Sequence, residues 1–319
     1  MRISILGAGA IGCYFAAQLH ASSADVEVIA RGANLDAIRA RGIRVTGDVE
    51  RDVKVQVASS ADARPADLLV TCTKAFALPA LSGDIARILA PGGLWVCMVN
   101  GIPWWYGNEP LQSVDPGGRI RAAVALERAM GCVAYLRSTL LEPGVAEYSG
   151  GRGLVVGMPD RTMPPRLAAT ADMFTRAGIA TTATPDIRSA VWNKLFGNVV
   201  MNPLSAITGL SIEALLADTE LRQLLAEVIQ EAMRVATAEG DKVETDVAQR
   251  LAYMVPLGAF RTSMLQDVDA GRPIELDAIL GAMLEVAQRC KVEVPASRRL
   301  YAMVAAFARS RGLMPTTAA

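Results

Sequence analysis

The stretch R-I-S-I-L-G-A-G-A-I-G, residues 2–12, decides the fold of the N-terminal half. An apolar strand precedes the glycines, a helix follows them, and residues 26–30 form a second strand. Gly7 permits a tight turn, Gly9 lets the backbone approach a pyrophosphate, and Gly12 lets the helix pack closely on the strand. A glycine loop at this place in a β-α-β unit predicts a doubly wound parallel α/β domain of the Rossmann type that binds a dinucleotide.

The residues beside this loop indicate which dinucleotide binds. The N–H groups at the start of the first helix, around Ala10 and Ile11, are expected to hold the phosphates. About 20 residues after the glycines, a domain that binds NAD carries Asp or Glu for the ribose hydroxyls. This chain has Arg31 at the end of the second strand. A guanidinium suits a 2′-phosphate, so NADP(H) is favoured over NAD(H), although an arginine there could also be an ordinary surface residue.

Two further buried strands end in polar residues. The first, residues 66–73, ends at Lys74, and the second, residues 94–99, ends at Asn100. The carboxyl ends of parallel strands meet at the edge of the sheet where ligands bind. We therefore expect Lys74 and Asn100 to lie near Arg31, although each alone could be an ordinary loop residue.

The rest of the N-terminal half mixes strands and helices. The predicted elements are an alternating strand at 53–57, a strand-rich segment at 119–136, hairpin material from 145, a helix at 164–177 and a linker at 181–185. We place the domain boundary after this linker. Residues 1–185 then form the dinucleotide-binding domain, and residues 186–319 form a second domain for substrate binding and dimerisation.

The second domain opens with V-W-N-K-L-F-G-N-V-V-M-N-P-L-S-A-I, residues 191–207. Apolar side chains surround most of this helix, so it should be buried. Lys194, Asn198 and Asn202 interrupt the apolar run every four residues and therefore stack along one line of the helix. Two interpretations are open: a hydrogen-bond ladder between helices, or a cleft wall that presents a proton donor and amides to a polar ligand.

Almost every segment after residue 186 has helical periodicity. The expected helices span residues 213–239, 246–254, 275–290 and 295–309. A polar segment that contains Ser263 precedes Glu275. Glu275 could serve only as an acidic residue at the start of a helix. We predict an all-helical domain, with the substrate cleft between it and the first domain.

Composition excludes several functions for this chain of 319 residues. Lys and Arg total 32 and so do Asp and Glu, which gives no basic surface for nucleic acid. No apolar run is long enough to span a membrane, and no signal peptide is evident. One histidine and five scattered cysteines predict no metal site and reduced thiols in a cytoplasmic protein.

The combination resembles the ketopantoate reductase family, whose members reduce 2-dehydropantoate (ketopantoate) to pantoate with NADPH. The resemblance covers nearly the whole chain. Its motifs are G-A-G-A-I-G at 7–12, Arg31, T-K at 73–74, N-G at 100–101, W-N-K-L-x-x-N-x-x-x-N-P-L-S-A at 192–206 and S-M-L-Q-D…G-R-P-I-E-L-D at 263–277.

The resemblance implies a role for each candidate residue. Lys194 would be the catalytic acid, and Glu275 would join it in binding the substrate. The other substrate contacts implied are Asn100, Asn198, Asn202 and Ser263. Cofactor contacts implied are Gly7, Gly9, Ala10, Ile11, Gly12, Arg31, Lys74 and Asn100, with Arg31 and Lys74 at the 2′-phosphate.

A lysine suits this chemistry. Hydride transfer to a 2-keto carbon places negative charge on the carbonyl oxygen, and a cation there stabilises the transition state and then supplies the proton. Desolvation in an apolar helix should lower the pKa of Lys194 toward a useful range, and a nearby Glu275 would oppose that shift.

The sequence departs from the family pattern at three places. Ile274 stands where the family usually has Thr, Ser211-Ile212 replace a further Asn, and Trp104-Trp105 follow the N-G-I-P segment. Two alternatives to ketopantoate reduction therefore stay open. One is an NADPH-dependent reductase of another 2-oxo acid, and the other is a non-catalytic NADPH-binding sensor. The apolar helical domain also allows a homodimer.

Overall fold

The structure is a computed structural model that describes residues 1–315. It divides into two compact units. Unit 1 comprises Met1–Val99 and Arg119–Ile187, and unit 2 comprises Asn100–Gly118 and the chain from Arg188 onward. The sequence predicted a single boundary after residue 185, whereas residues 100–118 belong to unit 2. This segment groups with unit 2 because its backbone bonds a helix there, Ile102 N donating to Ala278 O at 2.9 Å.

Unit 1 is built on a sheet that has ten strands within the described residues, in the order β4-β3-β9-β8-β7-β6-β1-β2-β5, with β10 beside β9. Five neighbouring pairs from β8 to β5 are parallel, whereas β8–β9 and β3–β4 are antiparallel. The bounds are β1 Arg2–Leu6, β2 Asp25–Ile29, β3 Ile43–Gly47, β4 Arg51–Val53, β5 Gln56–Ala58, β6 Ala66–Thr71, β7 Leu89–Met98, β8 Ala129–Glu142, β9 Val145–Gly157 and β10 Thr181–Ala183.

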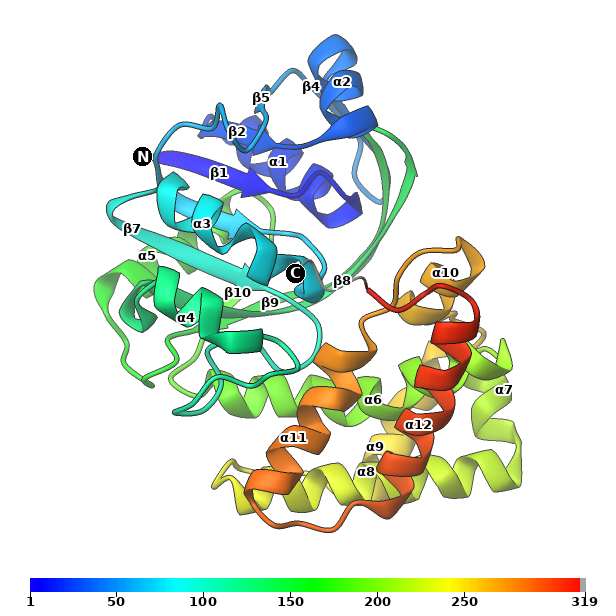
Figure 1. The fold of residues 1–319 in the computed structure, drawn as a ribbon. Helices are drawn as coiled ribbons and strands as arrows, with labels where there is room; N and C mark the ends of the chain where they lie inside the picture. Colours follow the sequence, from blue (N-terminus) through cyan, green and yellow to red (C-terminus); the bar gives the residue numbers. More distant parts are fainter. Residues whose placement is uncertain (316–319) are drawn as a thin grey trace. The chain divides into compact units, whose positions relative to one another are not determined.

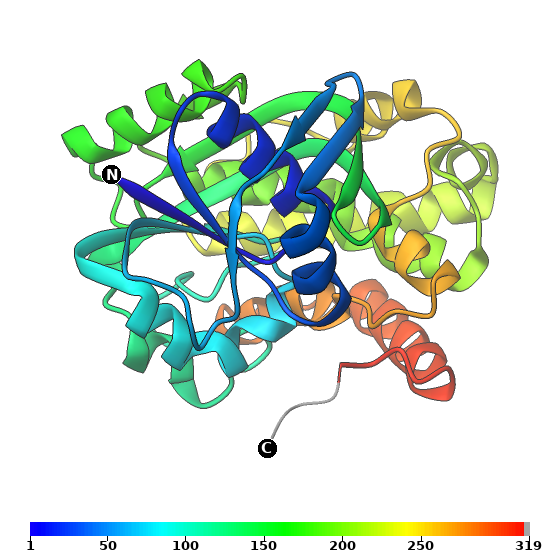
Figure 2. The same ribbon diagram turned by 90° about the horizontal axis from the view of Figure 1, so that it is seen from above.

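Helices connect and cover these strands. They are α1 Ala10–Ala21, α2 Gly32–Arg41, η1 Ala75–Ala77, α3 Leu78–Ile88, α4 Arg119–Ala123, η3 Leu126–Arg128 and α5 Pro165–Arg176. The connection β1-α1-β2 runs toward one edge of the sheet and β6-α3-β7 toward the other, as a doubly wound sheet requires. The long β8–β9 pair curves around α1, which contacts both strands (Figures 1 and 2). Phe15 of α1 packs edge-on against Phe174 of α5, with ring centroids 5.6 Å apart.

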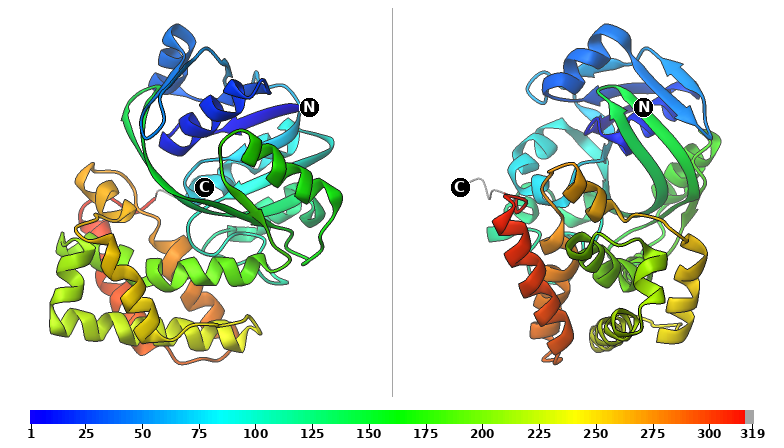
Figure 3. Two further views of the ribbon diagram at one scale, coloured as in Figure 1. Left: turned by 180° about the vertical axis from the view of Figure 1, so that it is seen from behind. Right: turned by 90° about the vertical axis from the view of Figure 1, so that its right-hand side faces the viewer.

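Unit 2 is helical (Figures 1 and 3). Besides the short turn η2 Pro116–Gly118 it contains α6 Ile187–Thr208, α7 Ile212–Ala217, α8 Thr219–Ala238, α9 Val247–Met254, η4 Val255–Leu257, α10 Ser263–Asp269, the π-helix η5 Asp277–Gly281, α11 Ala282–Arg289 and α12 Pro295–Ser310. Helix α8 contacts α7, α9, α11 and α12. The predicted fold class, a Rossmann-type sheet domain followed by helices, is confirmed. Within residues 1–315 no helix is long and apolar enough to cross a membrane.

Helix α6 is buried as predicted. Trp192, Leu195, Phe196 and Val199 are each at most 1% exposed. Its apolar side chains therefore stabilise unit 2 by burial, at about 1.5–3 kcal/mol for each large side chain. Of the polar line of the sequence, Lys194 and Asn198 are half-buried, whereas Asn202 is buried.

Several local predictions were wrong. The expected strand content at 119–128 is instead α4 and η3, because Ile120 and Val124 are buried at a spacing of four residues, which suits one face of a helix. The single strand expected at 53–57 is split between β4 and β5, and the linker at 181–185 contains β10, which pairs with β9. The long helix expected at 213–239 breaks at Asp218, whose side chain accepts from Leu221 N and caps α8.

Candidate active site

The glycine loop of unit 1 has the geometry that its sequence predicted. Gly7 has φ +111°, which favours glycine. A Cβ on Gly12 would lie 1.9 Å from Gly7 O, so the loop closes onto the helix only if this residue lacks a side chain. A Cβ on Gly9 would have no heavy atom within 4 Å. The loop therefore packs tightly at Gly12 and leaves open space over Gly9, where a pyrophosphate would need it.

The start of α1 is suited to an anion. Gly9 occupies the N-cap position without a side-chain cap, and the first turn, with Ala10, Ile11 and Gly12, contains no acidic residue. Unpaired N–H groups and the positive end of the helix dipole attract phosphate at such a position. The residues present thus fit the phosphates of a dinucleotide.

The two predicted cations at the 2′-phosphate also belong to unit 1. Arg31 is exposed, follows β2 and is the N-cap residue of α2, whose first turn has no acidic residue. Lys74 follows β6 and is the N-cap residue of η1. Both strands belong to the parallel core of the sheet, on either side of β1. The parallel topology therefore brings both cations to the carboxyl edge, where the glycine loop also lies.

In unit 2 two predicted site residues contact each other directly. Lys194 Nζ of α6 donates a hydrogen bond to Asn100 Oδ1 at 2.7 Å, although 94 residues separate them in the chain. Both side chains are half-buried. The amide oxygen therefore accepts one of the three hydrogens of the ammonium and fixes its direction.

The backbone after Asn100 explains why this asparagine lies against α6. Gly101 has φ +87°, and a Cβ on it would lie 2.0 Å from Ala278 O. The next residue, Ile102, donates its N–H to the same carbonyl at 2.9 Å. Only glycine allows the chain to approach η5 this closely, so Gly101 sets the course of the segment that carries Asn100.

The remaining candidates also lie in unit 2. Asn198 and Asn202 follow Lys194 on α6, half-buried and buried respectively. Ser263 is the exposed first residue of α10, next to its N-cap Thr262. Glu275, 7% exposed, immediately precedes the helical segment that contains η5, and its carbonyl accepts from Ile279 N at 3.2 Å. The helix was expected to include Glu275 and instead begins just after it.

Two contacts fix the backbone beside these candidates. The hydroxyl of Ser205, on α6, lies 2.6 Å from that of Thr262, which ties the start of α10 to α6. Arg272 Nε donates to the buried Asp267 Oδ1 at 3.0 Å and closes the turn that leads to Glu275. The polar segment of the sequence is therefore a fixed turn whose two ends carry Ser263 and Glu275.

The tryptophans after N-G-I-P are buried. Trp104 is 1% exposed and Trp105 is 3% exposed. Two tryptophans at this place could either line a substrate cleft or fill the protein interior. Their burial favours packing, which is what large aromatic residues usually do.

A buried cluster that the sequence analysis missed surrounds Tyr106. The Tyr106 hydroxyl donates to Asp241 Oδ2 at 2.6 Å and accepts from Trp192 Nε1 at 2.8 Å and from Arg188 Nη2 at 3.0 Å. Arg188 also donates to both Asp241 oxygens, at 2.9 and 3.0 Å, and to Glu239 Oε2 at 3.1 Å. In the sequence, Trp192 is one of the apolar residues of its helix, and nothing indicates that its indole N–H is bonded. The segment around Asp241 has the sequence of an ordinary surface loop after a long helix.

The electrostatics of this cluster favour a protonated Tyr106 hydroxyl and a charged Arg188. Burial raises the pKa of the Tyr106 hydroxyl, and the nearby Asp241 carboxylate raises it further. Burial opposes the charge of Arg188, but its hydrogen bonds and ion pairs with Asp241 and Glu239 outweigh that effect and raise its pKa. The hydroxyl is therefore a permanent donor to Asp241 near neutral pH.

Sequence comparison identifies relatives along the whole chain. Residues 3–161 match the profile of the family described as ketopantoate reductase PanE/ApbA, and residues 186–308 match its C-terminal profile. A 2-dehydropantoate 2-reductase of Mesorhizobium japonicum is 35% identical over 323 aligned residues, which cover 98% of this chain and 99% of the relative.

Solved structures show the same fold. A PanE/ApbA family ketopantoate reductase from Ralstonia eutropha JMP134 has a TM-score of 0.86 and 28% identity, with 98% of this chain and all of that one covered. A D-mandelate dehydrogenase in complex with NADH and anilino(oxo)acetate also reaches a TM-score of 0.86, at 23% identity and with the same coverage. Profiles, sequence relative and structures agree over nearly the full length, and the chain therefore belongs to the ketopantoate reductase family.

Proposed function

We propose that this protein catalyses the NADPH-dependent reduction of 2-dehydropantoate to pantoate, with Lys194 as the general acid. The observation that carries the proposal is the bond from Lys194 Nζ to Asn100 Oδ1 at 2.7 Å. It joins the residue that the family motifs imply as the catalytic acid to a residue that they imply as a substrate and cofactor contact. Membership of the family supports the same reaction.

NADPH binds to unit 1. Gly7, Gly9 and Gly12 shape the loop, the N–H groups at Ala10 and Ile11 hold the pyrophosphate, and Arg31 and Lys74 hold the 2′-phosphate. The support is the open space over Gly9 and the uncapped, acid-free start of α1. When bound, NADPH supplies the hydride that reduces the 2-keto carbon.

Lys194 acts at the carbonyl oxygen of the substrate. As the keto carbon is reduced, negative charge develops on that oxygen, and the ammonium stabilises it. A proton then passes from Nζ to the oxygen, which gives the hydroxyl of the product. Asn100 orients the ammonium through its amide oxygen. An oriented general acid contributes about 10²–10⁴-fold to the rate.

The other polar residues bind the substrate. The amides of Asn198 and Asn202 and the hydroxyl of Ser263 are donors that suit a carboxylate. Glu275 is an acceptor that suits the hydroxyl group of ketopantoate. The fixed turn at Arg272 and Asp267 supports this assignment, because it holds Ser263 and Glu275 in a defined relation.

We also propose a cellular location and an oligomeric state for the enzyme. It works in the cytoplasm, where its five cysteines stay reduced; none of them forms a disulfide within residues 1–315. It forms a homodimer through the helical unit, which has exposed apolar side chains at Tyr253, Val255 and Leu257. Analytical ultracentrifugation tests the oligomeric state, and a monomer at micromolar concentration would contradict the proposed homodimer.

The substrate is tested by following NADPH oxidation with ketopantoate and with a panel of other branched and aromatic 2-oxo acids. We expect the highest kcat/KM for ketopantoate. A much higher value for another 2-oxo acid would replace the substrate and keep the reductase chemistry. Tight NADPH binding without turnover of any keto acid would instead support a sensor.

A further inference from the structure

The contact between Asn100 and Lys194 needs support from elsewhere in unit 2. Asn100 belongs to the non-helical start of the segment 100–118, and Lys194 belongs to the long helix α6. Without an anchor, a loop side chain would sample several positions relative to a helix. The precise distance of 2.7 Å therefore requires contacts that hold the segment to α6.

Several hydrogen bonds hold the segment 100–118 to the helix formed by η5 and α11. Ile102 bonds Ala278 of η5, and the Ser113 hydroxyl donates to Glu285 Oε2 of α11 at 2.8 Å. Gln112 N donates to the other oxygen of Glu285 at 2.9 Å. These bonds fix the segment to the η5–α11 helix, but they do not determine its position against α6.

Tyr106 supplies the connection to α6. It lies six residues after Asn100, and its hydroxyl bonds Trp192 and Arg188, two residues and six residues before Lys194. Its ring also packs below the Arg188 guanidinium, 4.2 Å from centroid to Cζ. The segment and the helix thus meet at the same hydroxyl group.

The chemistry of its three partners fixes that hydroxyl in one orientation. A carboxylate only accepts, whereas guanidinium and indole N–H groups only donate. The Tyr106 hydroxyl must therefore donate to Asp241 and accept from the other two. Asp241, whose side chain is fully buried, also holds Arg188 and Trp192, with Trp192 Nε1 at 2.9 Å.

We propose that Tyr106 and Asp241 are positioning residues that hold Asn100 within hydrogen-bond distance of Lys194. They act through Asn100 and contact neither substrate nor cofactor. This inference rests on the proposed function, in which Lys194 is the general acid. It assigns a catalytic consequence to residues outside the family motifs.

The test variant is Tyr106→Phe, which keeps the ring and its packing and removes only the hydroxyl. Arg188 and Trp192 keep their bonds to Asp241, so the core of the cluster stays intact. We expect kcat to fall about 10- to 100-fold, because displacement of a reacting group by about 1 Å costs up to that order. KM for NADPH should change far less than kcat, because the proposed contacts to the pyrophosphate and the 2′-phosphate are all in unit 1 and Asn100 is the one proposed cofactor contact that the variant displaces.

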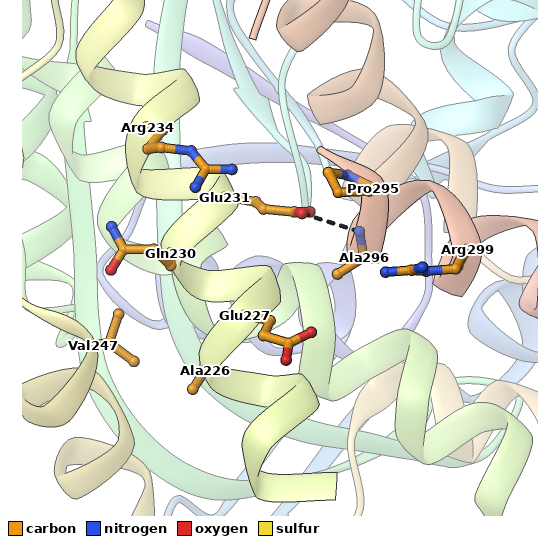
Figure 4. Close-up of a pocket in the computed structure, with 9 residues that line it drawn as sticks. All are labelled: Ala226, Glu227, Gln230, Glu231, Arg234, Val247, Pro295, Ala296 and Arg299. Atoms are coloured by element: carbon orange, nitrogen blue, oxygen red, sulfur yellow. Dashed lines mark hydrogen bonds between the residues drawn. The ribbon is translucent and has the colours of Figure 1, made fainter. Parts of the chain in front are cut away.

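Ser297→Ala is the matched control. Ser297 Oγ donates to the buried Glu231 Oε2 at 2.6 Å, and this carboxylate also accepts from Ser297 N. Figure 4 shows the same carboxylate accepting from Ala296 N at the start of α12. The control thus removes one buried hydroxyl from a carboxylate in the same unit, away from α6. It should lower the melting temperature about as much as Tyr106→Phe and leave kcat unchanged.

A double-mutant cycle with Asn100→Ala separates positioning from general destabilisation. Residues that act through one another are not additive. In the Asn100→Ala background, Tyr106→Phe should therefore change kcat less than twofold, measured with whichever 2-oxo acid the wild type reduces fastest. Full additivity of the two effects, or a normal kcat for Tyr106→Phe, would overturn the inference.

Failure of the inference and failure of the proposed function give different results. If Asn100→Ala and Lys194→Ala both keep normal kcat, the proposed catalytic role of Lys194 is wrong. If both lose activity and Tyr106→Phe does not, only the positioning role is wrong. A crystal structure of Tyr106→Phe adds a readout that needs no turnover: the Nζ–Oδ1 distance should exceed hydrogen-bond range, and an unchanged distance would contradict the inference.

Discussion

The glycine loop of unit 1 and the lysine helix of unit 2 form their sites in different ways. The loop uses backbone groups of six consecutive residues, and its fit to a phosphate depends on the absence of side chains at Gly9 and Gly12. The lysine site uses side chains from distant parts of the chain, with Asn100 and Lys194 joined across 94 residues. The site for the dinucleotide can therefore be encoded by one short stretch of sequence. The site for proton transfer depends instead on the tertiary packing of distant residues.

The largest effect is expected from a variant that disrupts the glycine loop of unit 1. In Gly12→Ala, the new Cβ would lie 1.9 Å from Gly7 O, so the loop must open. We expect NADPH binding, measured by fluorescence titration, to be lost. Gly83→Ala on α3 is the control, because its Cβ would meet no heavy atom within 4 Å. Retained NADPH affinity in Gly12→Ala would mean that this loop does not hold the pyrophosphate.

A smaller effect distinguishes the two cofactors. Arg31→Ala should weaken NADPH binding about 10- to 150-fold, because charge-assisted bonds contribute about 1.5–3 kcal/mol. NADH binding should be nearly unchanged, since NADH lacks the 2′-phosphate. Equal losses for both cofactors, measured by isothermal titration calorimetry, would show that Arg31 binds another part of the dinucleotide.

The smallest effect concerns the anchor of the segment 100–118. Burial raises the pKa of Glu285, but bonds from Ser113 and Gln112 and the charge of Arg289 outweigh it and lower the pKa below its usual value. A carboxyl with a lowered folded pKa stabilises the protein above its unfolded pKa, and this contribution is lost as pH falls through the folded pKa.

Glu285→Gln should therefore cost about 1 kcal/mol of unfolding free energy at pH 7. The difference from wild type should shrink as pH falls below the unfolded pKa of about 4.3 and vanish below the lowered folded pKa. Urea unfolding across this pH range measures it. Glu293→Gln, at an exposed position, is the control. A difference that stays constant with pH would show that the Glu285 charge does not anchor the segment.

The sequence predicted the local features well and the distant contacts only in part. The glycine loop and Arg31 could be located because their roles follow from position in a β-α-β unit. Lys194 and Asn100 were selected as separate candidates, and their direct contact could not be derived because it depends on the packing of residues 100–118. The role of Asp241 could not be predicted for the same reason, since 135 residues separate it from Tyr106.

The local errors have a similar cause. The apolar residues within 119–128 fit both the spacing of a strand and the spacing of a helix. Ile120 and Val124 are both buried, which is consistent with a helix. The strand at 181–183 has little signal of its own and forms because β9 offers it a pairing edge. In both segments the contacts with the surrounding structure, and not the local preference of the residues for strand or helix, decide the secondary structure.

The most direct test of the central claim, that Lys194 supplies chemistry and unit 1 supplies cofactor binding, is Lys194→Ala. We measure kcat and the NADPH dissociation constant on the same preparation, with the melting temperature as a check of folding. If Lys194 is the general acid, kcat should fall by about 10²–10⁴-fold. NADPH affinity should be nearly unchanged, and the variant should be folded. A folded variant with near-normal kcat would contradict the claim.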